Sequence, residues 1–339
     1  MDTKQELSLY TELLKEYVDT NDEKILYQAE QFSRQLMQDG ISPEEIVEVH
    51  FTALHEIIPD MDQRVRDSFY FLIETMIYYG MAYQRYFEMK EEEISLRTEI
   101  DVAANMQNTL LKTEIPNSEA LDIGAISLPA RQMSGDYYHF VQDDEKNIGV
   151  AIADVSGKGI PAAFVMSMIK YAMESFPDNR MYPRLILKLL NRVVERNVET
   201  GMFVSMFYGL YDTDEHKFYF ASAGHEPGFI YRHETKTFEE IRGKGLLLGI
   251  EKESNYEQFE LDVNPGDVII LLTDGVTECK SGDRFIEQQE VLEVIQKYID
   301  LSSDKLVENA YKHFERLQDF QLRDDFTLVA IRRKDEKEV

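Results

Sequence analysis

The chain has few cysteines, little positive charge and no long apolar run. Cys279 is its one cysteine, so no disulfide can form within the chain. Lysine and arginine number 36 against 64 aspartate and glutamate, and the formal net charge is -28. This charge disfavours nucleic acid and anionic membranes as partners. A phosphorylated substrate is also repelled, unless metal ions or local basic side chains reverse the sign at the site.

The N-terminus and the apolar segments do not indicate export or membrane insertion. The first residues, MDTKQELS, lack a basic segment followed by an apolar core, and no apolar stretch approaches the roughly 18 residues of a membrane-spanning helix. We therefore expect a cytoplasmic protein. Its hydrophobic fraction of 43% is sufficient for a buried core, and its length of 339 residues favours two domains.

Residues 1–82 carry the patterns of helices. Ser42 precedes Pro43 and Glu45, which is the order of a capping box at a helix start. The apolar residues that follow recur near the 3.6-residue period: Ile46, Val47, Val49, Ala53, Leu54 and Ile57. These patterns predict an all-α bundle of about four helices. Because the bundle has no cluster of residues suited to catalysis, we expect a domain for partner binding or dimerisation.

A longer helical pattern covers residues 83–112, without proline or glycine. Its apolar residues are spaced by four, three, three and four: Leu96, Ile100, Ala103, Met106 and Leu110. One interpretation is a linker helix that pairs with its copy in a homodimer. The other is an amphipathic helix that packs on its own domain.

After Pro116 the hydrophobic pattern changes to that of strands. Strands are expected in LDIGAIS, GDYYHFVQ, NIGVAIAD, MFVSMFYGLY, KFYFASAG, GFIYR, DVIILLTD and FTLVAIRR. Helical patterns come in two pairs, at about 161–176 and 184–197 and at about 288–298 and 305–318. Meandering strands with paired helices favour an α+β domain over residues 120–333, built as a four-layer α-β-β-α sandwich.

Four aspartates stand where strand-like runs meet turns: Asp136 in SGDYYHF, Asp154 in IADVSGKG, Asp274 in LLTDGVTE and Asp324 in RDDFTLV. A single aspartate in a turn usually caps the local backbone. Four at strand ends are expected to converge on one acidic pocket. Divalent cations relieve the repulsion between such carboxylates and accept their oxygens as ligands. The sequence therefore predicts a two-metal hydrolase.

These segments, together with ASAGHEPG, resemble the motifs of the metal-dependent Ser/Thr protein phosphatases (PPM), in particular the bacterial SpoIIE and RsbU branch. The five motifs occur in the family's order between residues 120 and 333, which is more specific than any one of them. The helical N-terminal region adds to the likeness with the RsbU type, which acts in the sigma-B general stress pathway. The resemblance implies phosphoserine hydrolysis with two Mn²⁺ or Mg²⁺ ions.

The resemblance also implies roles for individual residues. Asp154 bridges both metals, and the Val155 carbonyl binds one of them. Asp274 and Asp324 complete the other metal site, while Asp136 ligates a metal or holds a metal-bound water. Residues implied near the substrate or behind the ligands are Arg131, Gly157, His225 and Asp325.

Some positions depart from the family pattern or have two interpretations. Many eukaryotic members carry a histidine general acid shortly after the bridging aspartate, but Ser156 and Gly157 stand there, so no general acid is assigned. Arg131 lies five residues before Asp136, as does an arginine that contacts phosphate in those family members. It either contacts phosphate or is an ordinary surface arginine. His225 lines the site, or makes a structural hydrogen bond to the backbone.

The resemblance implies an RsbV-like substrate, a phosphorylated anti-sigma-factor antagonist, and an RsbT-like switch-kinase activator on the N-terminal helices. Other phosphatase chemistries do not fit. The phosphate loop of a cysteine phosphatase needs an arginine at a fixed distance after the cysteine. Counted from Cys279, that position is Phe285, and Arg284 comes one residue too early. A haloacid-dehalogenase type needs an Asp-x-Asp pair, which Asp154-Val155-Ser156 lacks. The remaining alternative is a signalling scaffold with an inactive phosphatase-like domain.

Overall fold

The computed structural model describes residues 3–38, 41–157, 159–175, 182–198, 201–281 and 284–335. The chain divides into two compact units, Met1–Thr98 and Glu99–Val339. The helix end predicted near residue 176 lies outside the described residues. Within the described ranges, no helix combines the length and the apolar character needed to cross a membrane.

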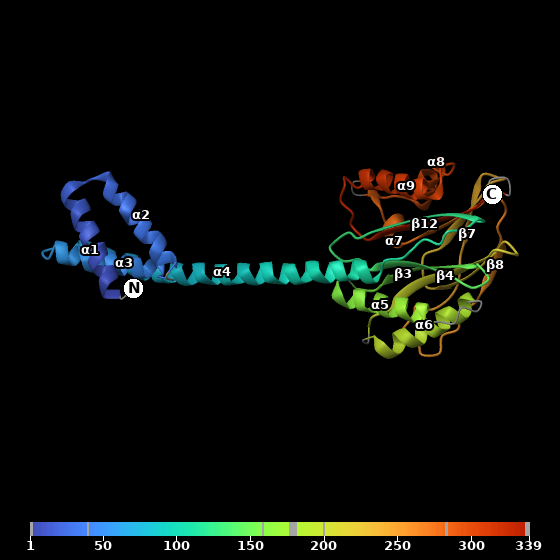
Figure 1. The fold of residues 1–339 in the computed structure, drawn as a ribbon, viewed down its shortest axis with the longest axis horizontal. Coiled ribbons are helices and arrows are strands. Elements are labelled where there is room, and N and C mark those ends of the chain that lie inside the picture. The colour runs from blue at the N-terminus through green and yellow to red at the C-terminus, as the bar shows by residue number, and fades with distance from the viewer. Residues whose placement is uncertain are drawn as a thin grey trace. The chain divides into compact units, whose positions relative to one another are not determined.

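The N-terminal unit is helical, as predicted. Its elements are α1 (Thr3–Thr20), α2 (Glu23–Gln38), α3 (Pro43–Ile57) and the first part of α4 (Gln63–Leu110) (Figure 1). The capping box at α3 is confirmed, since Pro43 is the first helical residue and the Ser42 N–H donates to Glu45 Oε2 at 3.1 Å. Helix α1 packs against α2 and α3. Helix α4 has 48 residues and passes through Gly80 without a break.

The C-terminal unit contains two five-stranded antiparallel sheets, with the strand orders β1-β12-β9-β6-β7 and β2-β3-β4-β5-β8. The strands are β1 (Leu121–Leu128), β2 (Asp136–Gln142), β3 (Ile148–Val155), β4 (Val204–Asp212), β5 (Lys217–Ala223), β6 (Gly228–Arg232), β7 (Thr237–Ile241), β8 (Phe259–Asp262), β9 (Val268–Leu272) and β12 (Phe326–Arg333), with a short hairpin of β10 (Lys280–Ser281) and β11 (Arg284–Phe285). All eight predicted strands are present. The edge strands β7 and β8 were not predicted, because TFEEI and FELD lack an apolar run.

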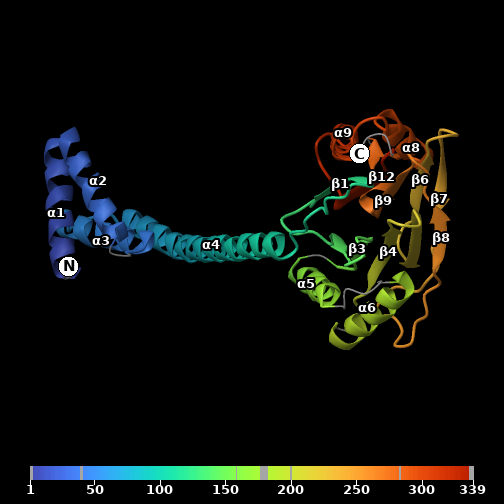
Figure 2. The same ribbon diagram turned by 45° about the vertical axis from the view of Figure 1, so that its right-hand side comes forward.

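Helices cover the outer faces of both sheets (Figures 1 and 2). Helices α5 (Ile160–Glu174) and α6 (Pro183–Asn197) pack on the sheet that contains β3 and β4, and α8 (Gln288–Lys297) and α9 (Ser303–Leu317) pack on the sheet that contains β12. A third core, with Ile152, Phe207 and Ile269, lies between the sheets. The predicted four-layer α-β-β-α sandwich is confirmed.

Candidate active site

Asp136 and Asp154 lie at one end of the core between the two sheets. Asp136 in β2 is paired across the strands with Asp154 in β3, so their side chains share one face of the sheet. Side chains alternate along a strand, and this face also carries Phe140 and Ile152 into the core between the sheets. The fold therefore brings these two carboxylates together.

Thr273, which follows β9, links the opposite sheet to Asp136. Its hydroxyl donates to Asp136 Oδ2 at 2.6 Å and accepts the Thr327 N–H at 3.2 Å. Burial, followed by the carboxylates of Asp154 and Asp325, raises the pKa of Asp136 well above its ordinary value, although hydrogen bonds from the two threonines oppose the shift. Thr273 was missed by the sequence reasoning. The one sequence feature that marks Thr273 is its position at the end of an apolar run, directly before Asp274-Gly275.

The Asp325 carboxylate fixes the segment between β1 and β2. Its Oδ1 accepts the Ala130 N–H at 2.7 Å, and its Oδ2 accepts the Gly135 N–H. A Cβ on Gly135 would stand 3.3 Å from Asp154 Oδ1 and 3.4 Å from Asp325 Oδ2. The backbone beside Asp136 therefore packs closely against both carboxylates.

Asp274 and Asp324 form a second acidic pair. Asp274 begins the single-turn helix α7 (Asp274–Thr277). Burial, followed by the carboxylates of Asp324 and Glu278, raises the pKa of Asp274. A side chain on Gly275 would clash with the backbone carbonyl of Asp325. This close contact explains the glycine of the Asp-Gly motif and holds α7 against the start of β12.

The turn from β3 to α5 has backbone in the left-handed region, with φ of 104° at Gly157 and 80° at Gly159. Ser156, at the position of the family's histidine, accepts the Phe203 N–H at 2.7 Å through its hydroxyl. Arg131 is exposed and lines a hollow of about 380 Å³ with Gly159. Arg131, in the segment between β1 and β2, therefore borders the same hollow as the β3–α5 turn.

The imidazole of His225 lies on the face of the sheet that carries Asp154. Its Nδ1 lies 2.8 Å from the Ser205 hydroxyl, and Ser205 pairs with Asp154 across β4 and β3. Burial lowers the pKa of His225 to about 4. The ring is therefore uncharged at neutral pH and is a weak proton donor for a leaving alkoxide.

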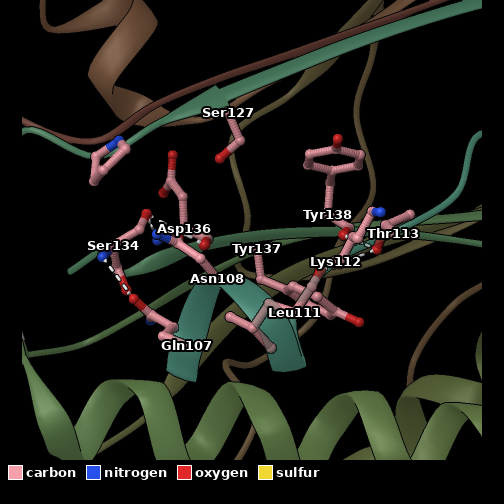
Figure 3. Close-up of a pocket in the computed structure, with 11 residues that line it drawn as sticks. Gln107, Asn108, Leu111, Lys112, Thr113, Ser127, Ser134, Asp136, Tyr137 and Tyr138 are labelled. Carbon is pink, nitrogen blue, oxygen red and sulfur yellow. Dashed lines mark hydrogen bonds between the residues drawn. The ribbon is translucent and has the colours of Figure 1, made fainter. Parts of the chain in front are cut away.

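Gln107, near the end of α4, binds the segment that precedes Asp136 (Figure 3). Its Nε2 donates to the Ser134 carbonyl at 2.8 Å, and its Oε1 accepts the Ser134 N–H at 3.1 Å. Gln107 is only 4% exposed. Gln107, Ser127, Ser134 and Asp136 line a pocket of about 210 Å³. No sequence pattern predicts this contact.

The acidic side chains are suited to a hard cation by their chemistry. Among the residues that the structure describes, no three His, Cys, Asp or Glu side chains are spaced to hold one ion. The carboxylates instead form pairs, and burial, followed by neighbouring carboxylates, raises the pKa values of Asp136 and Asp274. Carboxylate and carbonyl oxygens are the ligands that Mg²⁺ and Mn²⁺ prefer.

Both units match known families. Residues 8–82 match the N-terminal domain family of phosphoserine phosphatase RsbU, and residues 144–334 match the stage II sporulation protein E (SpoIIE) family. Phosphoserine phosphatase RsbU of Bacillus subtilis (strain 168) is 50% identical over 325 residues, which cover 96% of this chain and 97% of that protein. The chain belongs to the SpoIIE family of PP2C-type phosphatases. It is a protein-serine/threonine phosphatase.

Solved structures agree with this fold. The SiaA-PP2C domain of Pseudomonas aeruginosa superposes with a TM-score of 0.61 at 19% identity and covers 73% of this chain and 100% of that one. A SpoIIE structure from Bacillus subtilis, with the PP2C domain and part of the regulatory domain, has a TM-score of 0.56 at 19% identity and covers 64% of each chain.

Proposed function

We propose that this chain hydrolyses phosphoserine on an RsbV-like anti-sigma-factor antagonist and thereby activates a general stress sigma factor in the cytoplasm. The observation that carries the proposal is the hydrogen bond from Thr273, next to Asp274, to Asp136 in the opposite sheet, where Asp136 pairs with Asp154, in a chain of this family. Residues 120–333 form the catalytic domain. Residues 1–82 bind partners, and residues 83–112 are the linker.

The proposed enzyme uses two divalent cations, Mn²⁺ or Mg²⁺. Asp154 and the Val155 carbonyl hold one side of the site, Asp274 and Asp324 hold the other, and Asp136 ligates a metal or holds its water. Such ions supply a nucleophilic water at neutral pH and neutralise the phosphoryl oxygens. Asp325 positions the backbone behind the ligands. Arg131 and the Gly157 turn contact the phosphate, and His225 supports the strand pair that carries Asp154 through its contact with Ser205.

We also propose regulation through the helical region, with an RsbT-like activator on the N-terminal helices and a homodimer as the active assembly. Support comes from the many large apolar side chains that α4 leaves exposed, among them Phe71, Tyr78, Met89, Leu96 and Met106. Gln107 supplies a direct bond from the last turn of α4 to the segment beside Asp136. A partner that favours one position of this turn can thus favour one state of the site.

Phosphate release tests the function. With manganese, the full chain should release phosphate from the serine-phosphorylated antagonist and, more slowly, from an aryl phosphate. Chelator should abolish both reactions, added manganese should restore them, and the activator should raise the rate with the antagonist. If neither substrate releases phosphate in a metal-dependent way, even with the activator, the chain is a scaffold.

The metal-free protein should lose stability as pH rises. Burial raises the pKa of Asp136, so the folded state holds a proton that the unfolded chain releases at lower pH; the stability present in acid is lost as pH rises through the folded pKa. Burial lowers the pKa values of His139 and His225 to about 4. These two histidines therefore make the protein more stable as pH rises from about 4 to 6.5, and they do not change its stability above that range.

We therefore expect Asp136 to lower the melting temperature in chelator as pH rises above about 3.9, the ordinary pKa of aspartate, toward its own raised pKa. Manganese should raise the melting temperature more at the higher pH, because carboxylate ligands must be deprotonated. Scanning fluorimetry at several pH values measures both effects. Asp136→Asn should flatten the profile in chelator. A manganese shift that is the same at every pH would contradict the proposed ligands.

A further inference from the structure

Helix α6 has a positive outer surface in a strongly negative chain. It carries four basic residues and one acidic residue, Glu195, whereas the whole chain has a net charge of -28. By formal charge, each of the other helices in the described part of the chain is neutral or negative. The basic residues of α6 recur every four positions and form what is here called the basic stripe: Arg184, Lys188, Arg192 and Arg196.

The basic stripe lies on the side of α6 that faces away from the core. Ile186, Leu190 and Val194 are fully buried on the opposite side. Leu185 and Leu189 stand among the basic residues and are 49% and 40% exposed. In the part of the chain that the structure describes, no stripe residue forms an ion pair with an acidic side chain. Within the described ranges, Lys188 instead donates to the neutral Asn255 Oδ1 at 3.4 Å.

The basic stripe runs toward the end of the sheet that holds the acidic residues. The chain beyond α6 enters β4, where Val204 and Ser205 pair with Val155 and Asp154. Met202, just before β4, packs near the β3–α5 turn, since a Cβ on Gly157 would be 3.8 Å from Met202 Cε. From Arg184 to Arg196 the stripe is about 18 Å long, because a helix rises about 1.5 Å from each residue to the next. Figures 1 and 2 show α6 on the outside of this sheet.

We propose that the basic stripe is the docking surface for an acidic segment of the phosphorylated protein substrate. The inference rests on the proposed function and adds how that substrate is recognised. A chain of charge -28 repels an acidic phosphoprotein at long range, and a phosphoserine itself adds about -1.5 to -2. The stripe makes the local charge positive on this side of the domain, which speeds the encounter with the substrate and favours one orientation of it. Leu185 and Leu189 supply the apolar contact of a protein surface, which a free phosphate cannot use.

The test compares two doubly charge-reversed variants. Lys188→Glu/Arg192→Glu alters the stripe, while Lys305→Glu/Lys312→Glu alters α9 on the other outer layer by the same total charge. Each is assayed with manganese on the phosphorylated antagonist and on an aryl phosphate. We expect the stripe variant to lose about tenfold or more in kcat/KM for the antagonist, mainly through KM, with a weaker dependence on salt. Its aryl phosphate rate, and both rates of the α9 variant, should match the unaltered chain.

Three results would overturn the proposal. Unchanged kinetics on the antagonist would mean that the stripe does not dock it. An equal loss on both substrates, in a stripe variant whose thermal unfolding is unchanged, would mean that the stripe acts on the active site and not on docking. Anionic phosphatidylserine vesicles are sedimented with each variant; vesicle binding that only the stripe variant loses, with antagonist kinetics intact, would assign the stripe to membranes. Failure of the proposed function is distinct, because the unaltered chain would then hydrolyse neither substrate.

Discussion

Replacing Asp154 or Asp274 with asparagine should give a folded protein whose turnover is lower by about three orders of magnitude or more. Asparagine keeps the shape of the side chain but removes the negative charge that a bridging or terminal ligand supplies. Because the two residues come from opposite sheets, each substitution removes one side of the proposed site. Initial rates with manganese, on the phosphorylated antagonist and on an aryl phosphate, measure the effect.

The matched control is Asp300→Asn, which removes the same charge at an exposed position after α8. Its rates should equal those of the unaltered chain. Circular dichroism and thermal unfolding should show that all three variants fold. A rate within tenfold of normal for either Asp154→Asn or Asp274→Asn would exclude the two-metal mechanism.

Replacing Asp325 with asparagine should have the largest effect on stability. The two Asp325 oxygens accept the Ala130 and Gly135 N–H groups, whereas an asparagine can accept only one of them and turns its amide donors toward the other. An unsatisfied buried N–H together with a lost charge-assisted hydrogen bond costs about 3 kcal/mol. Relief of the repulsion between Asp325 and Asp136 opposes this loss. We therefore specify unfolding in saturating manganese, where the repulsion is neutralised.

In that buffer the melting temperature of Asp325→Asn should fall by about 6 °C or more. The rate should fall as well, because the segment that positions Asp136 is released. Asp300→Asn again serves as the control and should unfold like the unaltered chain. A melting temperature within about 1 °C of normal would show that the two hydrogen bonds contribute little.

The elements of this fold could be predicted where the apolar pattern is continuous. NIGVAIAD predicts β3, because both of its faces are buried, and the helices on each sheet follow from their own periodicity. The edge strands β7 and β8 could not be predicted, because most of their residues are exposed or half-buried and their sequences have no apolar run. The single continuous α4 likewise reflects the absence of a breaker strong enough to end it, since Gly80 inside a helix costs only about 1 kcal/mol.

The candidate aspartates could be identified from the sequence because each stands at a strand end. The separate contacts that each aspartate makes could not be identified in the same way. Asp324 and Asp325 are adjacent and identical in type, yet Asp325 bonds two backbone N–H groups while Asp324 faces Asp274. The two side chains differ because neighbouring residues of an extended segment point in opposite directions, so each meets a different distant part of the chain. Thr273 and Gln107 depend wholly on contacts between segments far apart in sequence.

The paired bonds between Gln107 and Ser134 have a consequence for the kind of signal that this helix end can carry. A shift of one residue along an α-helix moves a side chain by about 1.5 Å and turns it by about 100°, whereas good N–H···O distances span only about 0.5 Å. Both bonds join the same amide to the same backbone residue, so they form and break together. Any displacement of this helix end would therefore break both bonds at once, so the proposed signal from α4 to the segment before Asp136 would be all-or-none and not graded.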